Sequence, residues 1–273
     1  MNLKSSMKPV KIETYEQYIQ LVDRYNLKGR FTNDYLQNEA ADLIMHDSLF
    51  ALCGEENAVL LVQKDGFQRL YYYINNPDET IELPQREYVT EILFRGENAP
   101  EAEVQWLERI GFHKNLVRDQ YFAKYASLTP SVLISGLNIE TATTEDDALW
   151  AIRLFNASFD KWSGDYIPEA MAHLLIQENA ILMAKDTEGN RLGALQFELR
   201  QGACWLNHVA VVTEARGKKI GRGLTEAYIE QGHVDDNSRY MLWVQRQNVS
   251  AVAMYRNKGF ATMNKSTLSM IRL

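Results

Sequence analysis

The chain has 273 residues, of which 46% are hydrophobic and 24% charged, as in an ordinary globular protein. Its formal net charge of −7 argues against nucleic-acid binding through a general basic field. No run approaches 18 apolar residues and the N-terminus lacks the apolar core of a signal peptide, so we expect a cytoplasmic protein with no membrane span.

The first half of the chain mixes helix and strand signals. Apolar side chains recur at helical spacing over residues 13–25 and 33–46, and Thr14 with Gln17 forms a capping box at the first of these helices. Proline begins a third helix at 100–110. Strands are predicted over 49–53, 58–63, 67–74, 88–94 and 114–124.

Residues 127–137 are the best linker candidate, and after them a similar order of elements returns. We expect strands over 138–142, 180–185, 191–200, 203–212, 240–245 and 267–272, and helices over 144–155, 168–177 and 224–231, with a further short helix after 248. The chain is therefore divided into a first domain at 1–130 and a second at 131–273.

A nine-residue similarity suggests that the second half duplicates the first. Val104 to Phe112 resembles Val252 to Phe260, and each segment follows a strand and precedes another. The first half contains no counterpart of residues 216–223. We therefore expect a degenerate first domain that has kept the scaffold and lost the binding loop.

That binding loop lies between strand 203–212 and helix 224–231. It is basic and rich in glycine, running from Arg216 to Gly223, and it opens a helix whose first N–H groups have no internal partners. Its glycine spacing fits neither the dinucleotide-binding loop nor the Walker loop. The loop has the chemistry to bind phosphate, although a purely structural turn would use similar residues.

A second motif follows strand 240–245 and has the form Asn-x-x-Ala-x-x-x-Tyr-x-x-x-Gly-Phe. Asn248 suits a helix N-cap, while Ala251 and Tyr255 share a face of that helix. Gly259 suits the left-handed residue that ends the helix, and Phe260 would return to the core. Taken alone, Tyr255 could equally be a half-buried core residue.

The two motifs together resemble the GNAT superfamily of N-acetyltransferases. The loop is similar to the family's coenzyme A pyrophosphate loop, with Arg216 first and Gly221 last, although Lys219 stands where the family usually has glycine. This departure requires either backbone angles that are open to an ordinary residue or a looser loop. The helix motif matches at every position. The resemblance covers about residues 138–273 and the first half more weakly.

The resemblance implies the fold and the co-substrate. We expect an α/β (α+β) protein with two GNAT-like domains, each a mostly antiparallel sheet flanked by helices and splayed between two central strands, here 203–212 and 240–245. It also implies acetyl-CoA as co-substrate, with the pantetheine arm pairing along strand 203–212 and the pyrophosphate on the loop. The cofactor-binding residues so implied are Val209, Ala210, Val211, Arg216, Gly217, Lys218, Lys219, Ile220, Gly221, Arg222, Gly223, Asn248 and Tyr255.

The implied reaction is direct acetyl transfer to an amine, and three residues are candidates for catalysis. By resemblance, Tyr255 would donate a hydrogen bond to the leaving thiolate. Strand alternation puts Trp205, Asn207 and Val209 on one face and His208 on the other, packed against the following helix. Asn207 could orient a water molecule, and Glu198 is the most plausible base unless it simply faces solvent.

The partners expected are acetyl-CoA and a small-molecule or amino-acid-like amine, without nucleic acid, membrane or metal. The acceptor should lie against residues 155–166, where aromatics mix with Asp160 and Asp165, although a solvated loop would explain the same residues. A monomer and a homodimer are both open. The alternatives to an N-acetyltransferase are a non-catalytic acyl-CoA-binding regulator and an enzyme that uses a longer acyl chain.

Overall fold

The computed structural model describes residues 8–28, 31–64, 66–131, 136–163 and 166–273, which form two compact units. Unit 1 contains the chain up to Val117 together with Ser266–Leu273, and unit 2 contains Arg118–Lys265. Part of the predicted linker, residues 132–135, and Asp165 of the predicted acceptor segment lie outside the described residues.

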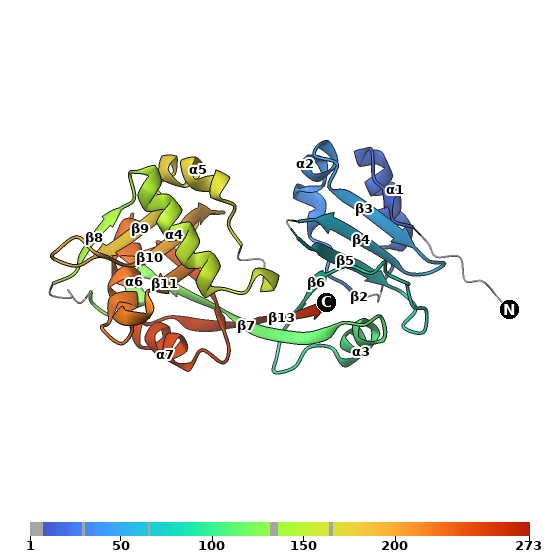
Figure 1. The fold of residues 1–273 in the computed structure, drawn as a ribbon. Helices are drawn as coiled ribbons and strands as arrows, with labels where there is room; N and C mark the ends of the chain where they lie inside the picture. Colours follow the sequence, from blue (N-terminus) through green and yellow to red (C-terminus); the bar gives the residue numbers. More distant parts are fainter. Residues whose placement is uncertain (1–7, 29–30, 65, 132–135, 164–165) are drawn as a thin grey trace. The chain divides into compact units, whose positions relative to one another are not determined.

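The described residues of unit 1 form six neighbouring strands and a short seventh, with helices on both faces of the sheet (Figure 1). Its helices are α1 (Tyr15–Tyr25), the short 3-10 turn η1 (Leu36–Asn38), α2 (Ala40–Met45) and α3 (Glu101–Arg109). Its strands are β1 (Val10–Lys11), β2 (Phe31–Thr32), β3 (Leu49–Cys53), β4 (Ala58–Gln63), β5 (Gln68–Ile74), β6 (Tyr88–Phe94) and the end of β13 (Ala261–Arg272).

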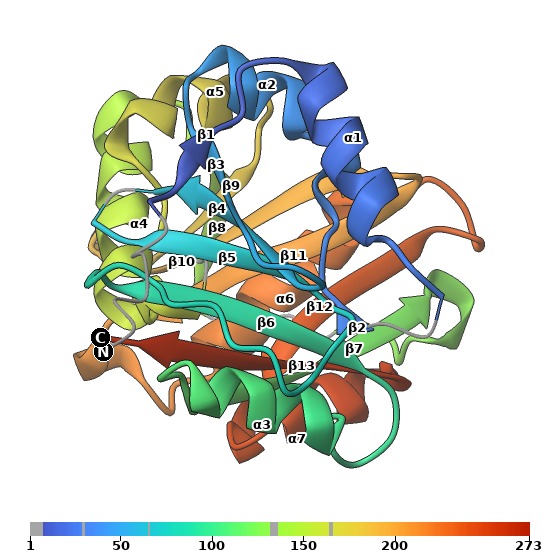
Figure 2. The ribbon, with the colours of Figure 1, turned by 90° about the vertical axis from the view of Figure 1, so that its right-hand side faces the viewer.

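The strand order in unit 1 is β1-β3-β4-β5-β6-β13, with β2 added beside β5. Strand β4 is buried on both faces, and its side chains alternate between two cores: Leu60 packs with α1 and α2, and Leu61 packs with α3. Figure 2 shows the red C-terminal strand β13 beside β6, with which it pairs antiparallel. The sixth strand of unit 1 therefore comes from the far end of the sequence.

Unit 2 has the same layers. Its helices are α4 (Glu145–Ser158), α5 (Ala172–Gln177), α6 (Ile220–Gln231) and α7 (Val249–Lys258), with short 3-10 turns η2 (Tyr125–Ser127), η3 (Lys161–Ser163), η4 (Glu169–Met171) and η5 (Thr213–Ala215). Its strands are the end of β7 (His113–Lys124), β8 (Asn138–Thr141), β9 (Ile181–Lys185), β10 (Arg191–Arg200), β11 (Ala203–Val211) and β12 (Arg239–Gln245).

The strand order in unit 2 is β8-β9-β10-β11-β12-β7, and it matches unit 1 position by position. In each unit every neighbouring pair is antiparallel except the fourth and fifth strands, which are parallel: β5 with β6 and β11 with β12. Helices α4 and α5 cover one face of unit 2, and α6 and α7 cover the other (Figure 1). The predicted pair of mostly antiparallel sheets flanked by helices is confirmed.

The sixth strand of each unit is contributed by the other half of the sequence. Residues 118–124 of β7 pair with β12 in unit 2, and residues 266–272 of β13 pair with β6 in unit 1. Where unit 2 has η5 and α6 between its parallel strands, unit 1 has a segment without helix or strand from 75 to 87. Unit 1 therefore lacks the helix whose N-terminus could bind phosphate.

The helix predicted over residues 33–46 is wrong in its first half. Residues 33–35 are not helical, and only η1 and α2 form in the remainder. The reason is that Asn33 and Asp34 use their side chains elsewhere: Asn33 bonds to β5 and β6, and Asp34 accepts hydrogen bonds from the hydroxyls of Tyr18 and Tyr73. Such side chains compete with the helix for backbone conformation.

A buried carboxyl group lies in the first turn of α3. Glu103 is only 5% exposed and accepts a hydrogen bond from the hydroxyl of Tyr72, which is fully buried. Burial raises the pKa of Glu103 to about 7, and the bond from Tyr72 opposes part of this rise. Near neutral pH the fold therefore holds a carboxyl group that resists ionisation.

We expect the stability of unit 1 to fall as pH rises. Because the folded-state pKa of Glu103 lies above its ordinary value, its contribution is complete below about pH 4.5 and is lost as pH rises through about 7. Glu103→Gln should remove this dependence and raise the free energy of unfolding at pH 8 by about 2 kcal/mol. Urea unfolding of the wild type and of Glu103→Gln at pH 5 and pH 8 measures this free energy. If both proteins lose the same stability between the two pH values, Glu103 is not the group responsible.

Candidate active site

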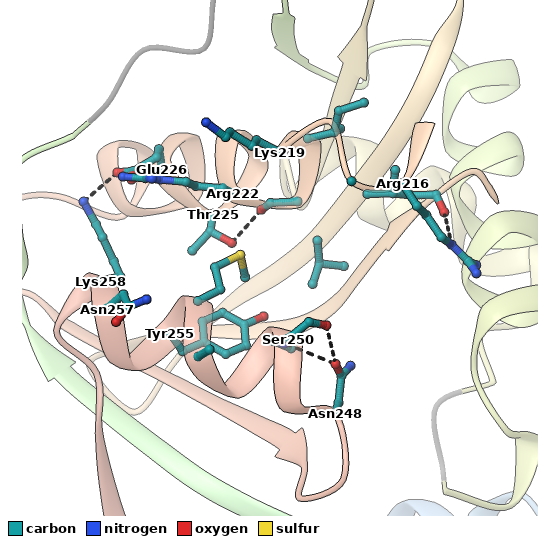
Figure 3. Close-up of a pocket in the computed structure, with 18 of the residues that line it drawn as sticks. Arg216, Lys219, Arg222, Thr225, Glu226, Asn248, Ser250, Tyr255, Asn257 and Lys258 are labelled. Carbon is teal, nitrogen blue, oxygen red and sulfur yellow. Dashed lines mark hydrogen bonds and ion pairs between the residues drawn. The ribbon is translucent and has the colours of Figure 1, made fainter. Parts of the chain in front are cut away.

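A cleft of about 680 Å³ lies between α6 and α7, over the end of β11 (Figure 3). The segment Arg216–Gly217 and the first turns of α6 line one side, and α7 from Asn248 to Lys258 lines the other. Val209 and Val211 of β11 form its floor. The two motifs singled out in the sequence therefore face each other across one cavity.

The sheet opens beneath this cleft. Strands β11 and β12 pair only through Cys204–Leu206 and Tyr240–Leu242. Beyond these residues the described ladder of β11 runs along its other edge, where β10 pairs with it as far as Val211. The expected splay between the two central strands is present, so an amide-bearing ligand could pair with β11 there.

The start of α6 is built to attract an anion. The helix begins at Ile220, four residues earlier than expected, so Gly221, Arg222 and Gly223 belong to its first turn rather than to a loop. The first internal hydrogen bond of the helix runs from the Gly223 N–H to the carbonyl oxygen of Lys219, so the N–H groups of Ile220–Arg222 precede it and point out of the helix at the positive end of its dipole. Arg216, Lys219 and Arg222 add cationic side chains around them.

Lys219 has the backbone conformation of a glycine. It caps α6 with φ of 64° and ψ of 14°, in the left-handed region. Of the two explanations for a lysine at a glycine position, the one that gives it ordinary backbone angles is therefore wrong. An L-residue here costs roughly 1–2 kcal/mol, and the side chain places a charge at the rim of the cleft.

We expect Lys219→Gly to raise the free energy of unfolding by about 1 kcal/mol, because it removes this strain. Lys218→Gly is the matched control. It removes the same charge from a residue without a positive φ, and it should lower stability by about 0.5–1 kcal/mol. Thermal unfolding of both variants measures these changes. Equal changes in stability would show that the left-handed backbone of Lys219 is not strained.

Helix α7 has the ends that its sequence predicts. The Asn248 side chain caps it by accepting from the N–H of Ala251 at 3.1 Å. Gly259 ends it with φ of 112°, and a Cβ there would lie 2.5 Å from the carbonyl oxygen of Ser127. Phe260 re-enters the core and packs edge-on against Tyr255. The caps thereby fix where Tyr255 projects.

Tyr255 lies in the middle of the α7 wall and lines the cleft (Figure 3). Its side chain is 3% exposed, and burial raises its pKa well above the ordinary value for a tyrosine. The hydroxyl therefore stays protonated at neutral pH. It can donate a hydrogen bond to a charge that develops in the cleft.

A β-bulge at Asn207 changes the predicted faces of β11. Gln196 pairs with His208 and Phe197 with Leu206, so Asn207 is the extra residue. Trp205 lies opposite Glu198 and shares the α4 face with His208, whereas Val209 faces the α6–α7 cleft. The prediction that Trp205 and Val209 share a face is therefore wrong, because the bulge shifts the alternation by one residue.

The two other catalytic candidates do not line the cleft with Tyr255. Asn207 is exposed at the bulge, and Glu198 on the α4 face is about one-third exposed and pairs with Arg200 at 3.2 Å. His208 is buried between Phe155 and Phe159. It packs against α4, which precedes it, and not against the following helix as predicted.

Most of the cofactor-binding residues predicted from the sequence do meet in the cleft. The residues that line it are Val209, Val211, Arg216, Gly217, Lys219, Ile220, Gly221, Arg222, Asn248 and Tyr255. Lys218 is exposed outside it, Gly223 is buried within α6, and Ala210 packs with the α4 core on the opposite face.

A buried ion pair that was not predicted from the sequence lies at one end of the cleft. Lys258 Nζ lies 2.6 Å from Glu226 Oε2 (Figure 3). It also donates a hydrogen bond to the carbonyl oxygen of Thr129 at 2.6 Å. The pair links α6 to α7, and Arg222 approaches Glu226 at 3.6 Å. The spacing of Arg222 and Glu226 is visible in the sequence, but nothing in it points to Lys258.

The helices among the described residues are all too short or too polar to span a membrane. The same residues contain no group of three or more histidine, cysteine, aspartate or glutamate side chains that could hold a metal ion.

Part of the second half of the chain resembles a known family. Residues 141–269 match the acetyltransferase (GNAT) domain. No curated protein matches the chain.

Solved structures share the fold over most of the chain. A tandem GNAT protein from the clavulanic acid biosynthesis pathway has a TM-score of 0.59 at 13% identity, covering 97% of this chain and 98% of its own. A GCN5-related N-acetyltransferase from Sphaerobacter thermophilus has a TM-score of 0.57 at 14% identity, covering 79% and 76%. A GCN5-related N-acetyltransferase from Kribbella flavida has a TM-score of 0.55 at 12% identity, covering 84% of this chain and 91% of its own. At these identities the likeness concerns the fold.

Proposed function

We propose that this chain, whose residues 141–269 belong to the GNAT acetyltransferases, transfers an acetyl group from acetyl-CoA to the amine of a small molecule or amino-acid-like acceptor. The second half, residues 131–273, would carry the activity. The observation that supports the proposal most is the single cleft that joins the N-terminus of α6, the open edge of β11 and the hydroxyl of Tyr255.

The cleft can accommodate the parts of acetyl-CoA in order. The pyrophosphate would accept from the N–H groups of the first turn of α6, with Arg216, Lys219 and Arg222 supplying charge. The amide groups of the pantetheine arm would pair with Val209–Val211 as an added strand. Asn248 would act indirectly, because its side chain is committed to capping α7.

The chemistry is a direct displacement in a ternary complex. The amine, once deprotonated, attacks the thioester carbonyl carbon, and the C–S bond then breaks to leave the thiolate of coenzyme A. The hydroxyl of Tyr255, which burial keeps protonated by raising its pKa, stabilises the developing sulfur charge by donating a hydrogen bond. The nitrogen loses one proton as the amide forms and the thiolate takes up one proton, so the products are the N-acetylated amine and the free thiol.

Removal of the proton from the amine falls to residues on the other side of the sheet. Glu198 lies opposite Trp205, on the face of the sheet that α4 covers, and Asn207 is the exposed extra residue of the bulge. Glu198 would take the proton, directly or through a water oriented by Asn207, once an acceptor displaces Arg200 from it.

Initial rates at varied acetyl-CoA and amine concentrations test direct transfer. Intersecting double-reciprocal lines are expected, because both substrates must be bound before the thioester breaks. Parallel lines would point to an acetylated enzyme and contradict the mechanism. Replacing acetyl-CoA with longer acyl-CoA thioesters in the same assay decides between the proposed donor and the alternative acyl chain.

A further inference from the structure

The parallel strands of unit 1 part in the same way as those of unit 2. Strands β5 and β6 pair only at Gln68–Arg69 and Tyr88–Val89. Strand β4 occupies the other edge of β5 along Gln68–Tyr73. From Leu70 onward, the edge of β5 that faces β6 therefore needs another partner.

Asn33 supplies that partner. Its Oδ1 accepts from the N–H of Tyr72 at 2.8 Å, and its Nδ2 donates to Thr90 Oγ1 and to the carbonyl oxygen of Glu91, each at 2.9 Å. Asn33 is 3% exposed and thus bridges the two parted strands from within.

The residues just before Asn33 continue along the same edge. Thr32 pairs with Tyr73 and Phe31 with Ile74, antiparallel to β5. Segment 31–33 thus adds a short strand and a carboxamide to the edge that β6 has left.

A second group fills unit 1 from the helix side. In the nine-residue similarity between the two halves, Val104 corresponds to Val252, so Glu103 stands where unit 2 has Ala251. Ala251 lines the open cleft of unit 2. Glu103 instead reaches the hydroxyl of Tyr72, on the parted stretch of β5.

We infer that unit 1 retains an amide-binding slot equivalent to the one beside β11, and that its ligand is the chain's own segment 31–33. In unit 1 a short strand and a carboxamide occupy the edge of β5 that corresponds to the open edge of β11. Glu103 fills the space on the helix side that stays open in unit 2, where the corresponding residue is the smaller Ala251. The comparison with a pantetheine arm rests on the proposed function, whereas the contacts in unit 1 do not. The chain should then bind a single acetyl-CoA.

Site-resolved amide hydrogen exchange of the full chain tests this inference. Without any ligand, the Tyr72 amide should be protected, and Asn33→Ala should speed its exchange about tenfold, the effect of losing one buried hydrogen bond. Adding acetyl-CoA should protect an amide within Val209–Val211 and leave Tyr72 unchanged. Native mass spectrometry should find one acetyl-CoA per chain.

Asn57→Ala is the matched control, since Asn57 is a buried carboxamide in the same unit that bonds the loop at Asn75–Asn76. Asn57→Ala should not speed the exchange of the Tyr72 amide more than that of other amides in unit 1. If Asn33→Ala does not fold, Thr90→Val removes one acceptor of Asn33 and should speed the exchange of Tyr72 by a smaller factor. Protection of Tyr72 by acetyl-CoA, or a second bound acetyl-CoA, would overturn the inference. Absence of any binding would overturn the proposed function instead.

Discussion

Replacing Tyr255 with phenylalanine should lower kcat for acetyl transfer about 10²-fold while leaving the Kd for acetyl-CoA within about twofold. The phenyl ring keeps the contact with Phe260, so the wall of the cleft is preserved and only the hydroxyl is lost. That hydroxyl is proposed to act when charge develops on sulfur, and not in the ground state. Calorimetric titration with acetyl-CoA and steady-state thiol release measure the two quantities.

Tyr228→Phe is the matched control for this variant. Tyr228 is also buried against the sheet, but its hydroxyl donates to the carbonyl oxygen of Cys204 and does not line the cleft. Its loss should cost about 1 kcal/mol of stability without a comparable loss of turnover. Unchanged turnover in Tyr255→Phe would remove Tyr255 from the mechanism.

Lys258→Met should lower the free energy of unfolding of unit 2 by about 3–5 kcal/mol. The substitution leaves the Glu226 carboxylate buried beside a methionine, and Arg222 at 3.6 Å is too exposed to replace the lost partner. The free carboxylate would also repel the phosphates proposed to bind nearby, so acetyl-CoA affinity should fall as well. Urea unfolding and titration with acetyl-CoA follow both effects.

The double variant Glu226→Gln with Lys258→Met separates charge from packing. It removes the uncompensated charge and should recover most of the lost stability. Arg153→Met breaks the exposed pair with Glu169 and should cost less than about 1 kcal/mol. If Lys258→Met costs no more than Arg153→Met, the buried pair does not hold α6 to α7.

Local signals predicted local structure well. The capping of α7 by Asn248 and its end at Gly259 depend on residues within one helix, so they can be read directly from the sequence. The strands around the cleft are similarly marked by their apolar residues. The two motifs meet in one site because α6 follows β11, α7 follows β12, and these two strands are parallel neighbours.

The errors arose where distant residues decide the outcome. Asn33 leaves its predicted helix because its partners are Tyr72, Thr90 and Glu91, tens of residues away. The bulge at Asn207 depends on how β10 pairs with β11 and has no signature in the spacing of β11 itself. Lys258 lies on the same helix as Tyr255, but its role follows from the packing of α6 against α7.

The sequence also does not show that each unit takes its sixth strand from the other half of the chain, because this pairing joins distant residues. Both β7 and β13 were predicted as strands, but the choice of partner depends on which sheet edge each one reaches. The nine-residue similarity between the halves did indicate the repeated topology that the structure shows. It could not show that each repeat is completed by a strand from the other half of the sequence.

The proposed acetyl transfer is tested most directly by incubating the full chain with acetyl-CoA labelled in its acetyl group and a panel of small-molecule and amino-acid amines. Mass spectrometry of the products is expected to show the label on the nitrogen of at least one amine, with one free thiol of coenzyme A formed per label. Thioester that binds but stays intact with every amine would contradict the account and favour a regulator that only senses acyl-CoA.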